Sequence, residues 1–274
     1  MSQAYPVLFV SHGAPTFAIE PGMAGVRLAE LGQSLPQPSA IVIVSPHWMT
    51  RGGVRVGSSA HPETIHDFGG FPQALYQLQY PAPGHPQLAE EISQLLAAAG
   101  IAASTEANRG LDHGAWVPLL HLLPNADVPV VQVSMPYPLT PLGAWQLGQI
   151  LRPVREQQVL IIGSGSLTHN LYEFRGNDGN PAEYVARFAE WTRTALRAAD
   201  LPTLLDYRRQ APAAERAHPS DEHLLPLFLA LGAAGEDYSV TVLEGGIAHG
   251  VLAMDSYVFN SPSTPSAVQE NAQI

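Results

Sequence analysis

Residues 41–47 read Ile41-Val42-Ile43-Val44-Ser45-Pro46-His47, an apolar β-branched run that ends close to a histidine. A run of this kind and length predicts a buried strand. A similar pattern occurs at Val7-Leu8-Phe9-Val10-Ser11-His12, and a third run, Leu160-Ile161-Ile162-Gly163, is followed after a short loop by His169. Because buried parallel strands end at the same edge of a sheet, we expect these histidines to gather at one mouth of the fold.

Helical and extended segments alternate along the rest of the chain. Expected helices span residues 85–99, 115–123, 142–151, 181–199 and 222–231, and expected strands span residues 101–106, 128–134, 159–163, 238–243 and 251–259. Strands separated by helices pair in parallel, whereas the short link 244–250 predicts an antiparallel addition. The predicted fold class is α/β: a single domain with a central mixed, mostly parallel sheet covered by helices on both faces.

The chain has 274 residues, and we expect one domain over residues 1–260. Residues 261–274 are rich in Pro, Ser and Gln, which predicts a flexible C-terminal tail. The stretch 52–84 is rich in glycine and proline and holds several aromatic residues. It is too long for a simple connection, so we interpret it as a partly ordered loop over a pocket.

The composition removes several kinds of chemistry. The chain contains no cysteine, and all 13 of its basic residues are arginine. Thiolate nucleophiles, iron–sulfur clusters and lysine Schiff bases are therefore excluded. A formal net charge of −11 argues against nucleic acid and anionic membranes as partners. Because neither a membrane-spanning stretch nor a signal-peptide pattern is visible, we expect a cytoplasmic protein.

The placement of the histidines predicts a metal site with an acid/base partner, because imidazole is the commonest metal ligand and titrates nearest neutral pH. His12 and His47 leave their strands at tight turns and are expected to share one ion. His218 precedes Ser220-Asp221-Glu222, so it is either a ligand or the neighbour of a helix cap. His223 is expected on a helix face. We interpret four others as ordinary: His61, His66, His85 and His121.

Three further histidines stand in predicted loops. The loop before His169, residues 163–168, lacks the third glycine of a dinucleotide fingerprint, and we interpret it as a turn that lets His169 approach a ligand. His113 follows Asp112 and is either a base oriented by that neighbour or a simple loop residue. His249 lies in the final short connection, where both a functional and a structural interpretation stay open.

Five motifs together resemble the class III extradiol ring-opening dioxygenases, and the nearest branch is the DOPA 4,5-dioxygenase-like proteins. The motifs are Ser11-His12-Gly13-Ala14-Pro15, Ser45-Pro46-His47-Trp48, Gly110-Leu111-Asp112-His113-Gly114-Ala115-Trp116, Gly163-Ser164-Gly165-Ser166-Leu167-Thr168-His169-Asn170 and His218-Pro219-Ser220-Asp221-Glu222-His223. The resemblance extends from His12 to Phe259.

This resemblance implies an enzyme that opens the ring of a catechol with O₂ to give a semialdehyde. It implies metal ligands at His12, His47 and His218, and it makes His169 the acid/base residue and a possible fourth ligand. His113 corresponds to a second pocket histidine, and His249 to a hydrogen-bonding group for the substrate. With a histidine in place of the usual glutamate, one divalent ion, Zn²⁺ or Fe²⁺, is expected, and Fe²⁺ suits dioxygenase activity.

Two other functions stay open at this point. One is a zinc-dependent hydrolase, in which His169 or Glu222 would act as the base. The other is a non-catalytic relative that keeps the fold and binds a metal. The sequence leaves open which catechol is used, which extradiol bond is cut and what the oligomeric state is.

Overall fold

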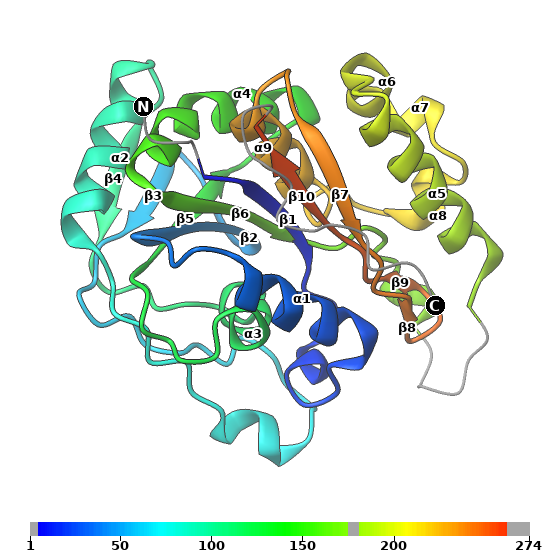
Figure 1. Cartoon of the computed structure of the whole chain (residues 1–274), viewed down its shortest axis with the longest axis horizontal. Coiled ribbons are helices and arrows are strands. Elements are labelled where there is room, and N and C mark those ends of the chain that lie inside the picture. The colour runs from blue at the N-terminus through cyan, green and yellow to red at the C-terminus, as the bar shows by residue number, and fades with distance from the viewer. Residues whose placement is uncertain (1–4, 175–180, 262–274) are drawn as a thin grey trace.

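The structure of the protein is a computed structural model that describes residues 5–174 and 181–261. Its centre is an eight-stranded sheet with the order β4-β3-β5-β2-β6-β1-β10-β7 (Figure 1). Four neighbouring strands in the middle run parallel: β5 (Val130–Pro136), β2 (Ala40–Thr50), β6 (Val159–Gly165) and β1 (Val7–Ser11). These strands are buried on both faces, which explains their continuous apolar sequences.

Shorter strands extend the sheet on both sides. On one side, β3 (Val54–Gly57) meets β5 antiparallel and β4 (Ala103–Glu106) in parallel. On the other side, β10 (Ser256–Asn260) is antiparallel to both β1 and β7 (Ser239–Leu243). The predicted antiparallel addition at the end of the chain is therefore confirmed.

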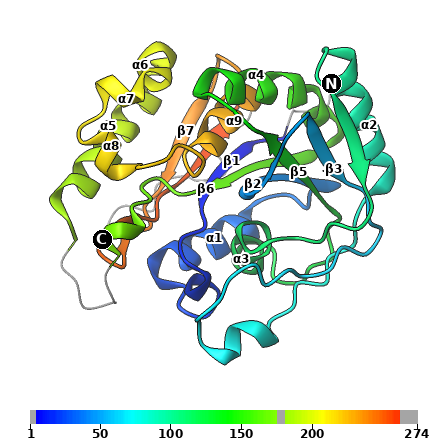
Figure 2. The ribbon, with the colours of Figure 1, turned by 180° about the vertical axis from the view of Figure 1, so that it is seen from behind.

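Helices cover both faces of the sheet (Figures 1 and 2). One face carries α1 (Gly22–Ser34) and α3 (His113–Leu122), and the opposite face carries α2 (Pro86–Ala98), α4 (Pro141–Leu151) and α9 (Leu225–Ala234). A group beyond the β7 edge contains α5 (Glu183–Arg197), α6 (Leu201–Leu205), α7 (Tyr207–Gln210) and α8 (Ala214–Ala217). The predicted α/β class, with one mixed sheet between two layers of helices, is confirmed.

Short elements complete the connections. They are the 3₁₀ helices η1 (Pro15–Ala18), η2 (Gln73–Gln77), η3 (Arg152–Gln157) and η4 (Leu171–Glu173), and the hairpin of β8 (Ile247–Ala248) and β9 (Leu252–Ala253).

Helix α9 is buried at every position because it lies between the sheet and α4. Gly148 of α4 and Gly232 of α9 make this possible, since a Cβ at either position would collide with the backbone of the other helix.

Several predicted boundaries were wrong. The stretch 52–84 is not entirely loop, because it contains β3, whose four residues are too few for a periodic signal. Helix α1 was not predicted, since no side chain caps its start. The helix expected from residue 222 begins at Leu225, and the strand expected over 251–259 is divided into β9 and β10.

Of the predicted flexible tail, 261–274, only Ser261 lies within the described residues. Among the helices that the structure describes, none combines the length and the apolar character that crossing a bilayer requires.

Candidate metal centre

The ends of β1 and β2 bring two histidines into contact. His12 follows β1 directly, and His47 lies near the end of β2, where the register against β5 shifts between Val44 and Met49. This shift takes His47 out of the regular ladder. The Nε2 atoms of His12 and His47 lie 3.3 Å apart, and the His12 side chain is buried. The expected meeting of these two strand-end histidines is thus present in the structure.

A third histidine approaches from the helical layer. His113 is the first residue of α3, and its ring centroid is 4.0 Å from that of His47 and 5.7 Å from that of His12. One nitrogen from each of these three rings lies within 4.8 Å of the other two. The approach depends on Gly114, because a Cβ there would lie 2.9 Å from Cδ2 of His47. His12, His47 and His113 can therefore hold a metal ion together.

Two more imidazoles face this group from the loops. The rings of His169 and His223 are stacked, with centroids 3.5 Å apart and an angle of 7° between their planes. The His223 ring is also 5.5 Å from His12 and 5.1 Å from His47. With Glu222, these two histidines form a second group of potential metal ligands. We call His12, His47, His113, His169 and His223 the histidine cluster.

His218 lies in neither group of potential ligands. Its ring is completely buried beside Phe188 and Tyr207, and its Nε2 is 2.9 Å from the carbonyl oxygen of Leu167. The expectation that placed it with His12 and His47 therefore disagrees with the structure. The expected helix face for His223 is also wrong, because His223 lies in the turn that precedes α9 and is directed to the strand ends.

Comparisons with known proteins agree with this geometry. Residues 8–260 match the family model described as the catalytic LigB subunit of aromatic ring-opening dioxygenase. The protein belongs to this LigB family. It is 40% identical to the 4,5-DOPA dioxygenase extradiol of Beta vulgaris, covering 92% of this chain and 96% of the relative. It is 37% identical to the Escherichia coli K12 protein of the same name, covering 92% and 94%.

A solved structure also resembles this LigB-family protein. It is the crystal structure of an uncharacterized protein from Escherichia coli K12, with a TM-score of 0.76 and 28% sequence identity. The match covers 93% of this chain and 99% of that one. The similarity in fold therefore extends over most of both chains.

Burial lowers the pKa values of four imidazoles of this LigB-family protein and keeps them neutral: His12, His47, His169 and His223. It lowers the pKa values of His12 and His223 well below 6.5, and the neighbouring histidines lower them further. Burial and the charge of His113 lower the pKa of His47 to about 3, against the opposite effect of Asp67. Burial also lowers the pKa of His169 to about 4. Neutral imidazole is the form that binds a metal ion or accepts a proton.

Asp67 connects the long loop with the cluster. Its Oδ1 accepts a hydrogen bond from the backbone N–H of His113 at 2.8 Å, and its Oδ2 lies 3.0 Å from Nδ1 of His113 and 3.8 Å from Nδ1 of His47. Burial would raise the pKa of Asp67, but its contacts with His113 outweigh burial and lower it to about 2. Asp67 is therefore an anion at neutral pH. No sequence pattern around Asp67 predicts this contact with His113.

Asp112 stabilises the start of α3, the helix that begins with His113. It caps α3 by accepting a hydrogen bond from the N–H of Ala115, and it also contacts Gln132 and Arg109. Burial and the charge of Asp67 raise the pKa of Asp112. Arg109 lies 3.2 Å from Asp112 and donates to the backbone carbonyl of His47 at 3.3 Å. This side chain therefore stabilises the segment that carries His47.

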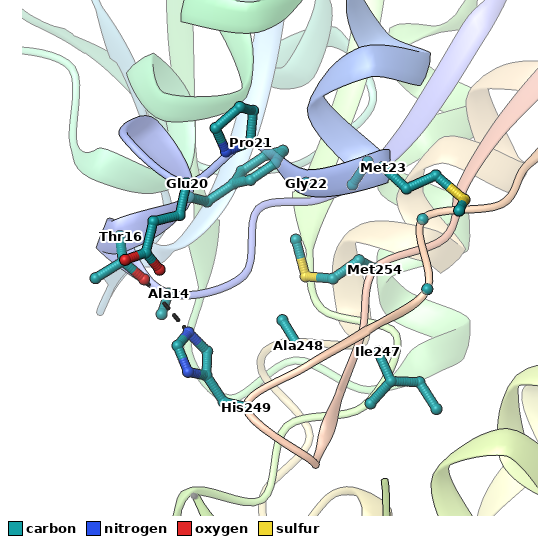
Figure 3. A pocket seen from close by; sticks show the side chains of 14 residues that line it. Ala14, Thr16, Glu20, Pro21, Gly22, Met23, Ile247, Ala248, His249 and Met254 are labelled. Carbon is teal, nitrogen blue, oxygen red and sulfur yellow. Dashed lines mark hydrogen bonds between the residues drawn. The ribbon is translucent and has the colours of Figure 1, made fainter. Parts of the chain in front are cut away.

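His249 lies apart from the cluster, at a neighbouring cavity of about 440 Å³ (Figure 3). Its Nε2 is 3.3 Å from the hydroxyl of Thr16, and its ring stacks on Phe174 with centroids 4.4 Å apart. Met23, Ile247 and Met254 give the cavity an apolar wall, and Glu20 adds a carboxylate. Since Thr16 and Phe174 closely follow His12 and His169 in sequence, His249 faces the segments that leave the cluster.

The histidines interpreted as ordinary have local roles. His85 caps α2, His66 and His121 bond to backbone carbonyl oxygens, and His61 is exposed.

Proposed function

We propose that this protein is a metal-dependent extradiol dioxygenase that opens the ring of a DOPA-like catechol with O₂ to give a semialdehyde. The observation that carries this proposal is the meeting of neutral histidine nitrogens from the ends of β1 and β2 at one edge of the sheet, in a chain that belongs to a family of aromatic ring-opening dioxygenases. The names of the Beta vulgaris and Escherichia coli relatives support a DOPA-like substrate.

The residues present fit one divalent ion. Two nitrogen ligands bound tetrahedrally at about 2.0–2.1 Å lie about 3.3 Å from each other, which matches the Nε2 atoms of His12 and His47. We propose these two residues as ligands, with Zn²⁺ or Fe²⁺ as the ion and Fe²⁺ for ring opening. A bound ion would lower the pKa of the catechol hydroxyls, and Fe²⁺ would also pass electron density from the catecholate to O₂.

The third ligand comes from His113 or His223, because both rings flank the pair formed by His12 and His47. Metal analysis of His113→Ala and His223→Ala discriminates between them. The variant that lacks the third ligand loses most of its metal, whereas the other retains it. Retention of a full equivalent by both variants would instead leave His169 or Glu222 as the third ligand beside His12 and His47.

His169 is the proposed acid/base residue. Its ring is partly exposed, its depressed pKa keeps it neutral, and its stack on His223 fixes the ring plane. A neutral imidazole in this position accepts the proton of a catechol hydroxyl and returns it to the opened product. We propose Phe68 as a wall for the aromatic ring, because it meets His113 edge-on with centroids 5.7 Å apart.

The test is reconstitution of chelator-treated protein with Fe²⁺ under anaerobic conditions, followed by DOPA or a simple catechol in air. We expect O₂ uptake and a yellow semialdehyde in equal amounts. Ester or amide hydrolysis with Zn²⁺ and no O₂ uptake would identify a hydrolase instead. Stoichiometric metal without either activity would identify a non-catalytic relative.

A cytoplasmic location and the absence of nucleic-acid partners stay predictions of the sequence.

A further inference from the structure

Ser164 determines which nitrogen of His12 carries a proton. Ser164 is completely buried on β6, the strand that lies between β1 and β2. Its hydroxyl donates to the backbone carbonyl of Gly114, which can only accept. The hydroxyl has one proton, so its contact with Nδ1 of His12 at 3.0 Å requires the imidazole to be the donor. His12 is therefore protonated on Nδ1, and its Nε2 presents a lone pair toward His47.

Asp67 acts on His113 through its negative charge and one backbone hydrogen bond. An ionised carboxylate has acceptors only, and both of its oxygens face His113: Oδ1 lies 2.8 Å from the backbone nitrogen and Oδ2 lies 3.0 Å from Nδ1. The negative charge of Oδ2 at this distance favours a proton on Nδ1 of His113, which leaves the lone pair on Nε2, and this contact acts through charge because it lacks the direction of a hydrogen bond. The same Oδ2 is 3.8 Å from Nδ1 of His47, where its charge favours a proton on that nitrogen as well.

We propose that Ser164 and Asp67 are positioning residues that fix the histidine tautomers of the metal centre, so that His12 and His113 offer Nε2 to the ion or to a proton. This proposal rests on the function proposed above and adds the residues that prepare the site for it. Partners of this kind orient metal-binding imidazoles and typically change metal affinity by about 10–100-fold. Gly114 connects the two, since its carbonyl accepts from Ser164 while the preceding residue, His113, is held by Asp67.

The first test is direct and needs no substitution at either positioning residue. Long-range ¹H–¹⁵N spectra of histidine-labelled, metal-free protein at pH 8 distinguish a proton on Nδ1 from one on Nε2. Signals are assigned by their loss in His12→Asn and His113→Asn. We expect both rings to be protonated on Nδ1. A proton on Nε2 of either ring would overturn the proposal for that residue, whether or not the protein opens catechols.

The second test compares matched serines. Ser166 is as buried as Ser164 and lies two residues further along, and within the described chain its hydroxyl has no hydrogen-bond partner. Titration with Zn²⁺ against a chromophoric chelator should show affinity about 10–100-fold weaker for Ser164→Ala and within about twofold of the parent for Ser166→Ala. Equal affinities for the two variants would contradict the role of Ser164.

The third test replaces Asp67 with its uncharged isostere. In Asp67→Asn the amide oxygen can keep the backbone contact to His113, which places the amide NH₂ toward Nδ1. The His113 ring should therefore move its proton to Nε2, and Zn²⁺ affinity should fall by about 10–100-fold. The control is Glu63→Gln, at an exposed position of the same loop. An unchanged His113 tautomer in Asp67→Asn would refute the assignment of Asp67.

These readouts separate the two proposals. If the wild-type protein shows the expected tautomers but takes up no O₂ with any catechol, ring opening fails and the positioning roles stand. If ring opening occurs and the tautomers are reversed, the positioning roles fail alone.

Discussion

Two regions of the molecule fix their histidines in different ways. At the ends of β1 and β2, the strands themselves set the positions of His12 and His47, because both strands run parallel to β6 between them and therefore end at the same edge of the sheet. In the segment 218–223 a turn sets the positions, and two histidines five residues apart have opposite environments. His223 reaches the cluster, whereas His218 is buried among aromatic rings. The comparison shows that sheet topology constrains a site more directly than a turn does.

The largest effect should distinguish His12 from His218. We expect His12→Ala to lose stoichiometric metal and all ring opening, because one of the two converging Nε2 atoms is removed. His218→Gln should keep its metal, since an amide can still donate to the carbonyl of Leu167, and should lose about 1–3 kcal/mol of unfolding free energy at most. Elemental analysis and denaturant unfolding of both purified variants measure this. Metal loss in His218→Gln would contradict the placement of His218.

The same contrast explains how much the sequence could predict. The apolar runs before His12 and His47 identify buried strands, and the parallel direction of these strands then predicts that both histidines lie at one edge of the sheet, although the strand order that brings them into contact is not in the pattern. For His218 and His223 the predicted helix began at residue 222, three residues before α9. Pro226 in the first turn of α9 was the available signal, because proline favours that position. A start at Leu225 would have left His223 in the preceding turn.

Asp67 could not be assigned from sequence for a related reason. It lies on the long stretch 52–84, where no periodicity fixes the direction of a side chain, and its partner His113 is 46 residues away. The tautomer contacts of Ser164 depend on the packing of β6 between β1 and β2 and on the close approach of α3. Strand order and helix packing of this kind are tertiary information that a local pattern does not contain.

The next effect concerns His169, which stacks on His223 in the histidine cluster. His169→Ala should keep most of the bound metal but lower ring opening by at least about 100-fold, the usual range for removal of a general acid/base. The measurement is O₂ uptake at saturating catechol together with metal content. If the His169→Ala variant opens the ring at the parental rate, then His169 does not transfer a proton in the reaction. Loss of all metal would instead make His169 an essential ligand.

Acid should destabilise the metal-free protein. The folded-state pKa values of His47, His169 and His218 are about 3, 4 and 3, below the ordinary 6.5 of the unfolded chain. Between pH 6.5 and about 4 the unfolded state therefore binds more protons, so unfolding free energy falls as pH falls. We expect a decreasing melting temperature across this range. In His218→Gln the pH slope should be smaller by up to about 1.4 kcal/mol per pH unit, and an identical slope would contradict the burial of neutral His218.

The smallest effect is expected at His249, which belongs to neither region and contacts Thr16 and Phe174 instead. Its ring bonds to Thr16 and stacks on Phe174 at the wall of the cavity, outside the groups that could hold a metal. A substrate hydrogen bond from this position is worth about 1 kcal/mol, so His249→Ala should raise KM about fivefold with metal content and kcat nearly unchanged. Thr16→Val serves as the matched control, because it removes the partner of His249 and leaves the imidazole. If His249 orients the substrate directly, Thr16→Val should change KM less than His249→Ala. Equal changes would instead mean that the contact between Thr16 and His249 holds the hairpin in place, and that His249 acts through the shape of the cavity.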